Sequence, residues 1–307
     1  MIPSDPANPT AEPNVEPGAV APEGAAPAEP AQKKKEGTDW WGEIKAIFWL
    51  ILGVLAVHSF IAKPFYIPSE SMMPVLLKGD RLVVTKYPYG WSWVSPSFHI
   101  FPETQGRLFG RLPERGDIVI LTPRGQRSDY IKRVIGLPGD TIEMVGGTLH
   151  INGQEVRRQA RAPVMVPVDP NVPCETDQFG DHRVEGPEGK LYCRLPVMRE
   201  TLPNGRSYDT IDMGYEAQVD DFAKVTVPPG HVWVMGDNRD KSADSRVPAS
   251  SQGLGGAVPF ENIGGRAEFI TFSLDGTSQY WNPISWFTAM RGGRAGDSLR
   301  PDEAKAR

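Results

Sequence analysis

The segment Pro68-Ser69-Glu70-Ser71-Met72-Met73-Pro74 follows closely on an uncharged apolar run, Ala46–Ala62. That run is at the short end of the roughly 17–25 residues that cross a bilayer as a helix. A serine in a loop directly after such a helix is a candidate nucleophile next to a membrane surface. Proline fixes its own φ, so Pro68 and Pro74 would stiffen the loop that carries Ser71.

The flanks of the apolar run predict a single membrane anchor over residues 40–63. Trp40 and Trp41 suit the headgroup interface, and Lys33–Lys35 and Lys45 precede the run, whereas only Lys63 flanks its other end. Positive charge stays in the cytoplasm, so we expect a cytoplasmic N-terminus and an exported body. The alternative is a buried core helix, which His58 and Ser59 favour slightly.

The composition excludes one class of partner. The 307 residues carry a formal net charge of -5, which gives no support for nucleic-acid binding. Residues 1–39 are rich in Pro and Ala up to the lysine cluster and begin with no apolar core. We expect this segment to be a disordered tail and not a cleavable leader.

The rest of the chain has the pattern of a mainly β protein. Gly and Pro are frequent, at 32 and 30 residues, and separate short runs of branched residues such as Arg81–Thr85 and Ile131–Ile135. We expect a catalytic β-core at 64–141 and 231–290, with an aromatic insertion at 90–112. Residues 142–230 are too long for a loop and predict an inserted β-subdomain, and 291–307 a flexible tail.

Two features of the exported part leave alternatives open. The aromatic insertion either packs on its own domain or dips into the membrane interface, where Trp is common. Cys174 and Cys193 either pair, if the region faces an oxidising compartment, or are two free thiols.

Ser71 needs a base, because a neutral hydroxyl is a poor nucleophile. The 5 histidines lie in the apolar run, in the insertions or on turns, with no orienting carboxylate motif beside them: His58, His99, His150, His182 and His231. Lys132, within Tyr130-Ile131-Lys132-Arg133-Val134-Ile135, is the better candidate, because burial lowers the pKa of a lysine. Taken alone, Lys132 would more often be a surface lysine. A Ser-Lys dyad is a known variant of the serine triad.

A third block, Gly236 to Arg246, supplies candidate supporting groups. Ser242 could orient the amine of Lys132 by a hydrogen bond, and Asp244 and Arg246 could pair and fix the loop. Gly236 would allow a close backbone approach. The N–H of Ser71 and the hydroxyl of Ser69 are local donors for an oxyanion. Alone, this polar block would be a solvated turn.

Together, the anchor and the three blocks resemble bacterial type I signal peptidases, the leader peptidases. The resemblance covers the span, 67–89, 116–140, 232–246 and 264–269. It implies that Ser71 is the nucleophile and Lys132 the general base, that Ser69 contributes to the oxyanion hole, and that Ser242 orients the lysine. Gly236, Asp244 and Arg246 would support the site. The residues implied to bind substrate are Phe65, Ile67, Pro68, Met72, Leu76, Leu82, Ile120, Asp129, Tyr130 and Ile131.

The resemblance implies a membrane-bound serine endopeptidase that cleaves signal peptides of exported preproteins after Ala-x-Ala junctions, without cofactor or metal. It would work on the periplasmic side of the bacterial inner membrane, in contact with lipid. Two positions depart from the family pattern: Glu70 stands where glycine is common, and Lys241 where asparagine is common. The rivals are a specialised Ser-Lys processing peptidase, a self-cleaving repressor, which lacks its DNA-binding domain here, and an inactive membrane-anchored binding module.

Overall fold

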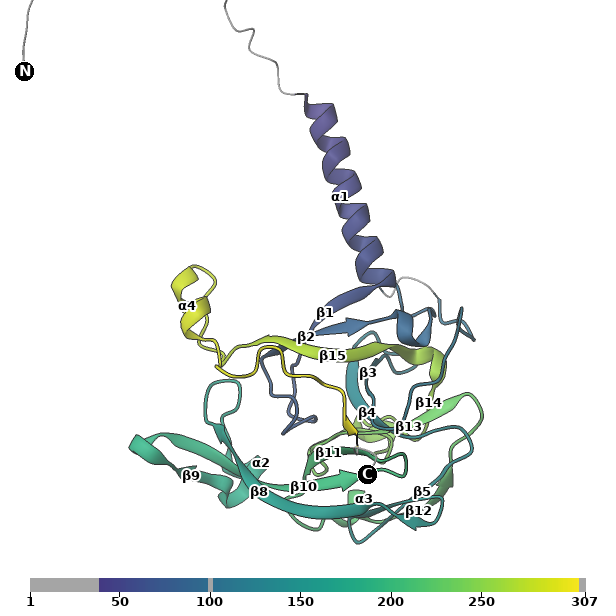
Figure 1. Cartoon of the computed structure of the whole chain (residues 1–307), viewed down its shortest axis with the longest axis vertical. Coiled ribbons are helices and arrows are strands. Elements are labelled where there is room, and N and C mark those ends of the chain that lie inside the picture. The colour runs from purple at the N-terminus through teal and green to yellow at the C-terminus, as the bar shows by residue number, and fades with distance from the viewer. Residues whose placement is uncertain (1–38, 99–101, 304–307) are drawn as a thin grey trace, which may run out of the picture. The chain divides into compact units, whose positions relative to one another are not determined.

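The computed structural model describes residues 39–98 and 102–303 and is mainly β (Figure 1), the expected fold class. The chain divides into two compact units, Met1–Lys45 and Ala46–Arg307, with the boundary inside the first helix. The contacts do not separate residues 142–230 from the rest of the second unit. Most of the expected tail at 1–39, and His99, lie outside the described residues.

Helix α1, Trp40–Phe60, has the length and composition of a membrane span, with a mean hydropathy of 1.7. The helix ends before residue 63, the expected limit of the anchor, because β1 begins at Ala62. The residue before a proline is pushed out of the helical region, so Lys63 is extended ahead of Pro64. Pro64 itself is tolerated because β1 is an edge strand.

The central sheet is antiparallel and its strand order is β1-β2-β15-β3-β4-β13-β14. Its strands are β1 (Ala62–Tyr66), β2 (Asp80–Thr85), β3 (Ile118–Leu121), β4 (Tyr130–Gly136), β13 (His231–Met235), β14 (Val258–Pro259) and β15 (Ile263–Ser273). β3 and β4 are fully or almost fully buried, in keeping with their runs of branched residues. The sheet therefore brings the three sequence blocks together, although they lie far apart in the chain.

The region 142–230 supplies most of two further sheets. One has the order β12-β5-β6-β7 and the other β16-β11-β10-β8, with β9 paired to β10. Their bounds are β5 (Thr141–Val145), β6 (Thr148–Ile151), β7 (Gln154–Glu155), β8 (Arg157–Pro167), β9 (Arg183–Glu185), β10 (Leu191–Thr201), β11 (Arg206–Ile211), β12 (Phe222–Thr226) and β16 (Asp302–Glu303). The turn between β6 and β7 is Asn152-Gly153, a residue pair that favours a tight hairpin turn.

The inserted region 142–230 shares a hydrophobic core with the central sheet. Ile135 and Trp233 of the central sheet are buried in one cluster with Ile142 and Leu149. Short helical turns connect the strands: η1 (Tyr87–Tyr89), α2 (Thr176–Phe179), η2 (Gly180–His182), η3 (Pro187–Gly189), α3 (Ala217–Asp220), η4 (Ala249–Ser251), η5 (Phe260–Asn262) and α4 (Pro283–Thr288).

The aromatic insertion is tied to its own domain. Trp91 pairs with Leu108 in an isolated bridge, and the Trp91 Nε1 donates to the Phe60 carbonyl at 2.9 Å. The Arg107 guanidinium donates to carbonyls on three different segments, including that of Ile263 at 2.6 Å. Phe109 nevertheless remains 83% exposed.

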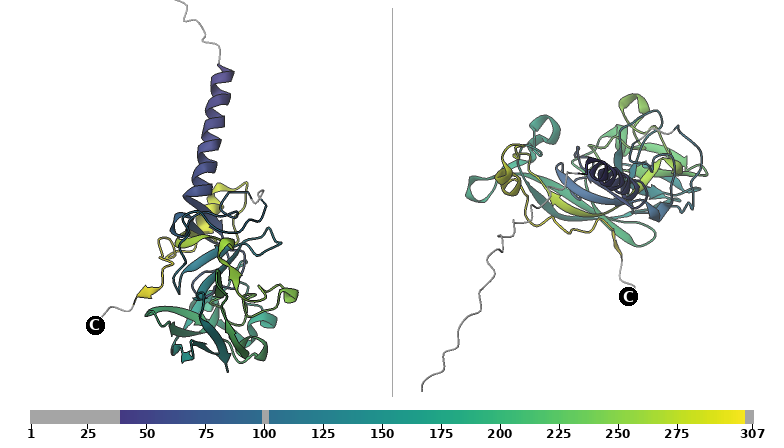
Figure 2. Two further views of the ribbon diagram at one scale, coloured as in Figure 1. Left: turned by 90° about the vertical axis from the view of Figure 1, so that its right-hand side faces the viewer. Right: turned by 90° about the horizontal axis from the view of Figure 1, so that it is seen from above.

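The segment expected to be a flexible tail is packed as far as Glu303. Arg291 pairs with Asp169 at 2.8 Å, and Arg294 donates to the carboxylate of Asp80 and to the Val75 carbonyl, both at 3.0 Å. Leu299 is 3% exposed in the core, and β16 pairs with β11. Partly buried arginine pairs hold this polar segment where composition alone indicated fraying. Figure 2 shows the yellow C-terminal segment along the outside of the β-rich body.

Candidate active site

Ser71 lies in the loop between β1 and β2 and is 6% exposed. Its carbonyl accepts a hydrogen bond from the Asn238 N–H at 3.1 Å, and the Asn238 side chain donates to the Glu70 carbonyl at 3.3 Å. The two residues after Ser71 point into different cores. Met72 is buried in a cluster with Ile67 and Ile131, and Met73 in a second one.

Lys132 reaches Ser71 from β4. Its Nζ donates to the Ser71 Oγ at 2.9 Å and to the Ile131 carbonyl at 3.0 Å. Burial lowers the pKa of Lys132 to about 8, and the positive charge of Arg246 acts in the same direction, whereas Asp244 and Asp237 raise it. A lysine with this pKa offers a growing fraction of neutral amine to the hydroxyl as the pH rises toward 8.

Ser69 lies beside the same hydroxyl. Its Oγ is 3.3 Å from the Ser71 Oγ, while its side chain is otherwise open to solvent. The backbone N–H of Ser71 has no hydrogen-bond acceptor among the described residues. Both groups expected to act as oxyanion donors therefore lie beside the Ser71 hydroxyl.

Gly236 is required by a close approach of two chain segments. A Cβ at this position would lie 2.2 Å from the Ser242 Oγ and 2.4 Å from the Ser71 carbonyl oxygen. The structure thus brings Ser242 next to the nucleophile. However, its Oγ is buried with no hydrogen-bond partner among the described residues, so the expected bond to Lys132 is not formed.

Asp244 and Arg246 form the expected pair at 2.9 Å, and both side chains are fully buried. Asp244 also accepts from the Gly236 N–H at 2.9 Å, and Arg246 donates to the Arg239 carbonyl at 2.8 Å. The pair therefore ties the 236–246 loop to itself directly behind the lysine.

Several buried groups near the site were missed from sequence. Arg133 pairs with Asp237 at 2.6 Å, and Arg239 pairs with Glu200 beside Tyr208. Asn238, which holds the nucleophile loop, was also missed. Arg133, Asp237 and Arg239 lie within the motif blocks, but each pairs with a residue distant in sequence, so no local signal could have found the pairs.

The expected substrate residues gather around one cluster. The structure buries six of them together and packs Phe65 against them: Ile67, Met72, Leu76, Leu82, Ile120 and Ile131. Pro68 is exposed, and Tyr130 packs on a different cluster. Asp129 accepts from the Thr122 hydroxyl at 2.7 Å. Five of these side chains are at most 3% exposed, so they form the floor of the site.

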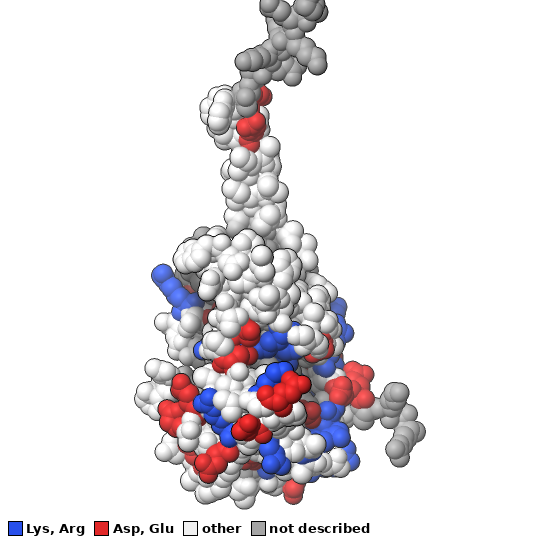
Figure 3. All heavy atoms as spheres, turned by 90° about the vertical axis from the view of Figure 1, so that its left-hand side faces the viewer, with Lys and Arg blue, Asp and Glu red and all other residues white. Residues whose placement is uncertain are grey.

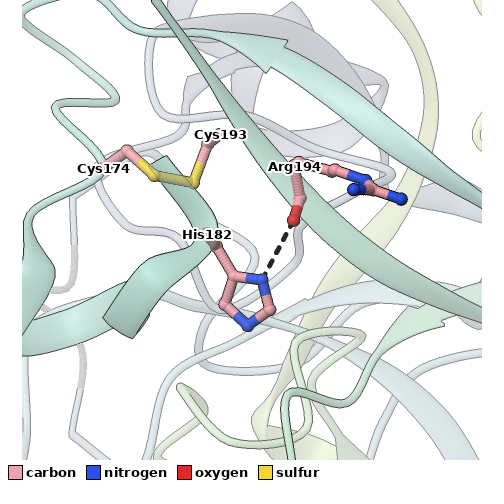
Figure 4. Close-up of a disulfide and its surroundings, with 4 residues drawn as sticks. All are labelled: Cys174, His182, Cys193 and Arg194. Atoms are coloured by element: carbon pink, nitrogen blue, oxygen red, sulfur yellow. Dashed lines mark hydrogen bonds between the residues drawn. A yellow bond between two sulfur atoms is a disulfide. The ribbon is translucent and has the colours of Figure 1, made fainter. Parts of the chain in front are cut away.

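The two cysteines form a disulfide (Figure 4). Cys174 and Cys193 are fully buried in the same cluster as Met73, two residues after the nucleophile. The open alternative between a disulfide and free thiols is thus settled in favour of pairing. His182 lies next to the disulfide, with its Nδ1 3.0 Å from the Arg194 carbonyl.

The histidines that the structure describes do not serve Ser71. The ring nitrogens of His150, His182 and His231 bond to carbonyls of Thr148, Arg194 and Pro229, and His58 lies in α1. A serine hydroxyl bonded to a buried lysine amine, carried by a mainly β body, is the arrangement of a serine hydrolase.

Comparison with known proteins identifies the group. The family described as signal peptidase, peptidase S26, matches residues 40–272. The chain is 36% identical over 239 residues to Signal peptidase I of Rickettsia typhi, covering 75% of this chain and 80% of that protein. It is 37% identical to Signal peptidase I of Rickettsia canadensis, covering 75% and 79%. The chain therefore belongs to the signal peptidase family, peptidase S26, and is a serine endopeptidase.

A solved structure of a signal peptidase I from Enterococcus faecalis covers 51% of this chain and 97% of its own. Its sequence identity to this chain is 23% and the TM-score of the comparison is 0.26.

Proposed function

We propose that this protein cleaves signal peptides from exported preproteins after Ala-x-Ala junctions, with Ser71 as nucleophile and Lys132 as general base. The observation that carries the proposal is the 2.9 Å hydrogen bond between the Lys132 amine and the Ser71 hydroxyl, inside a site that lowers the lysine pKa to about 8. Family membership supports the same chemistry.

In the first half of the reaction, neutral Lys132 takes the Ser71 proton as the Oγ attacks the carbonyl carbon of the junction. The developing oxyanion meets the Ser71 N–H and the Ser69 hydroxyl. The lysine ammonium then gives its proton to the departing amine, and the C–N bond breaks. The mature protein leaves with a new amino terminus, and the signal peptide remains as an ester on Ser71.

In the second half, Lys132 takes a proton from water as the water oxygen attacks the ester carbon. Collapse of the second tetrahedral intermediate returns the proton to the Ser71 Oγ and releases the signal peptide as a carboxylic acid, which loses its proton to solvent. One amine therefore acts as base and as acid in each half-reaction. The network of Asp244 and Arg246 would hold it in place throughout.

The substrate would bind as an extended strand over the cluster of Ile67, Met72 and Ile131. Strand β3 pairs with β4 along Tyr130–Arg133, whereas β13 pairs with β4 only from Arg133 onward. At Tyr130 and Ile131 the other edge of β4 thus has no strand partner in the described structure, and a substrate strand can add there, near Asp129. A floor of buried side chains favours small residues before the cleaved bond.

The catalytic proposal is tested with the purified full-length chain in detergent and a preprotein with an Ala-x-Ala junction. We expect Ser71→Ala and Lys132→Ala to lower kcat/KM by at least about 10³-fold, with mass spectrometry placing the wild-type cut at the junction. Ser250→Ala and Lys224→Ala, at exposed positions, are the matched controls.

Equal cleavage by all variants would mean a different catalytic centre. Cleavage by the wild type at another junction would point to a specialised processing peptidase. Absence of cleavage by the wild type would favour an inactive binding module.

We also propose that α1 crosses the bacterial inner membrane once, with the N-terminus in the cytoplasm and the body in the periplasm in contact with lipid. The length and hydropathy of α1 and the lysines before it support this orientation. The disulfide agrees with an oxidising compartment. Protease added to intact spheroplasts should degrade the chain after Lys63, and protection of the body until lysis would reverse the orientation.

A further inference from the structure

A second groove, lined by neither Ser71 nor Lys132, lies beside the 236–246 loop. It has a volume of about 360 Å³, within the range of ligand pockets. Its walls come from α2 and η2, from the loop after β11, and from the residues just before Ser242. The side chains that line it include Phe179, His182, Met213, Tyr215, Asp240 and Lys241.

The floor of this groove is continuous with the nucleophile segment. Phe179 is buried in the same cluster as Met73, and Met213 packs against that cluster. Met72, which precedes Met73, belongs to the cluster of Ile67 and Ile131, which the proposed function places under the residues before the cleaved bond. Ser71 therefore lies next to both hydrophobic clusters.

The far wall of the groove is also tied to Ser71. Asn238 donates to the Ser71 carbonyl, and the neighbouring residues Asp237 and Arg239 exchange backbone hydrogen bonds with Ile211 at the end of β11. Met213 and Tyr215 lie two and four residues beyond Ile211. The loop that forms this wall is therefore held to the same 237–239 segment that holds Ser71.

We propose that the groove binds the first residues of the mature protein, the segment that follows the cleaved bond. This inference rests on the proposed function and adds a specificity site to it. The occupant is an extended polypeptide whose backbone N–H groups meet acceptors in the groove and whose side chains meet the charges at its rim.

The polar groups of the groove suit such an occupant. Asp240 uses one carboxylate oxygen to accept from the Met213 N–H at 2.6 Å, while its other oxygen is buried without a partner in the described structure. Because the Arg194 carbonyl can only accept, the Nδ1 of His182 carries the proton, which leaves Nε2 as an acceptor in the neutral ring. Both residues therefore offer acceptors to peptide N–H groups.

A charged side chain at the rim of the groove interacts with the residue directly before Ser71. Lys241 is exposed, and Glu70, directly before Ser71, interacts electrostatically with Lys78, Glu175 and Lys241. We therefore expect the preference for mature segments to depend on Lys241.

The proposal is tested by cross-linking on an inactive background. Ser71→Ala/Tyr215→Cys is mixed with a preprotein that has a single cysteine at the second or third residue after the junction. We expect a disulfide-linked complex there, but not with a cysteine three residues before the junction. Lys224→Cys, exposed on β12, is the matched control. Linking that is absent at position 215, or equal at 215 and 224, would overturn the groove assignment.

A second measurement does not depend on the new cysteine. Lys241→Glu should change the ratio of kcat/KM for acidic over basic mature segments by about two- to fivefold toward the basic ones, and Lys224→Glu should leave it unchanged. An unaltered ratio would contradict the assignment. If the wild type cleaves the junction and Ser71→Ala does not, failure of both groove tests refutes the groove alone. If the wild type does not cleave, the proposed function fails first.

Discussion

At the scale of single residues, the site depends on one amine kept from water. Ser71 and Lys132 are 6% and 3% exposed, and their hydrogen bond joins positions separated by 61 residues in sequence. The motifs predicted both residues, because a serine with no histidine base leaves few alternatives. The choice between a buried and a surface lysine could not be settled from sequence, since the burial of Lys132, which supports its proposed role as base, arises from packing of β4 against distant segments.

The pH dependence of cleavage follows from the direction of this pKa. The folded protein lowers the Lys132 pKa from 10.5 to about 8, so the neutral base form grows as the pH rises through about 8 and is lost below it. We expect kcat/KM of the wild type to fall about tenfold per pH unit below that value. The measurement is a pH–rate profile with a preprotein substrate.

The residual activity of Lys132→Ala serves as the control and should not show this step. A wild-type profile that stays flat down to pH 5 would contradict a lysine base.

At the scale of elements, the short helix α4 and the turn before it expose large apolar side chains. Tyr280, Trp281, Ile284 and Phe287 are each at least 72% exposed. Figure 1 shows α4 projecting beyond the end of β15, and in Figure 3 the upper part of the body is uncharged over a broad area. A soluble monomer rarely exposes such a patch, and aromatic side chains favour the membrane interface.

We expect Trp281→Ser/Phe287→Ser to lower kcat/KM for a preprotein in lipid vesicles by about tenfold, because less apolar area enters the interface. Activity toward a short soluble peptide in detergent should remain within about twofold. Val145→Ser, which removes an apolar side chain that is 54% exposed elsewhere, is the control. An equal loss in vesicles and in detergent would show that α4 acts on the site itself, not through lipid.

At the scale of the whole molecule, the strands of the central sheet and the anchor could be predicted from local patterns. Runs such as Ile131–Ile135 and the Asn152-Gly153 turn specify strands and a hairpin through short-range geometry. The joint core of Ile135, Trp233 and Leu149 could not be predicted, because it links the insertion to the central sheet through packing alone. The same holds for the roles of Asn238 and Glu200, whose partners lie far away in sequence.

The C-terminal segment packs against the loop that carries Ser71, and this affects when the site is completed during export. Arg294 binds Asp80 across 214 positions of sequence, and Leu299 completes the cluster beneath Met72. On the proposed topology the body crosses the membrane in the order in which it is synthesised, so Ser71 and Lys132 emerge well before these two residues. A half-translocated copy carries its reactive groups in an unfinished core. We therefore expect each molecule to become able to cut only after its own export has passed residue 299.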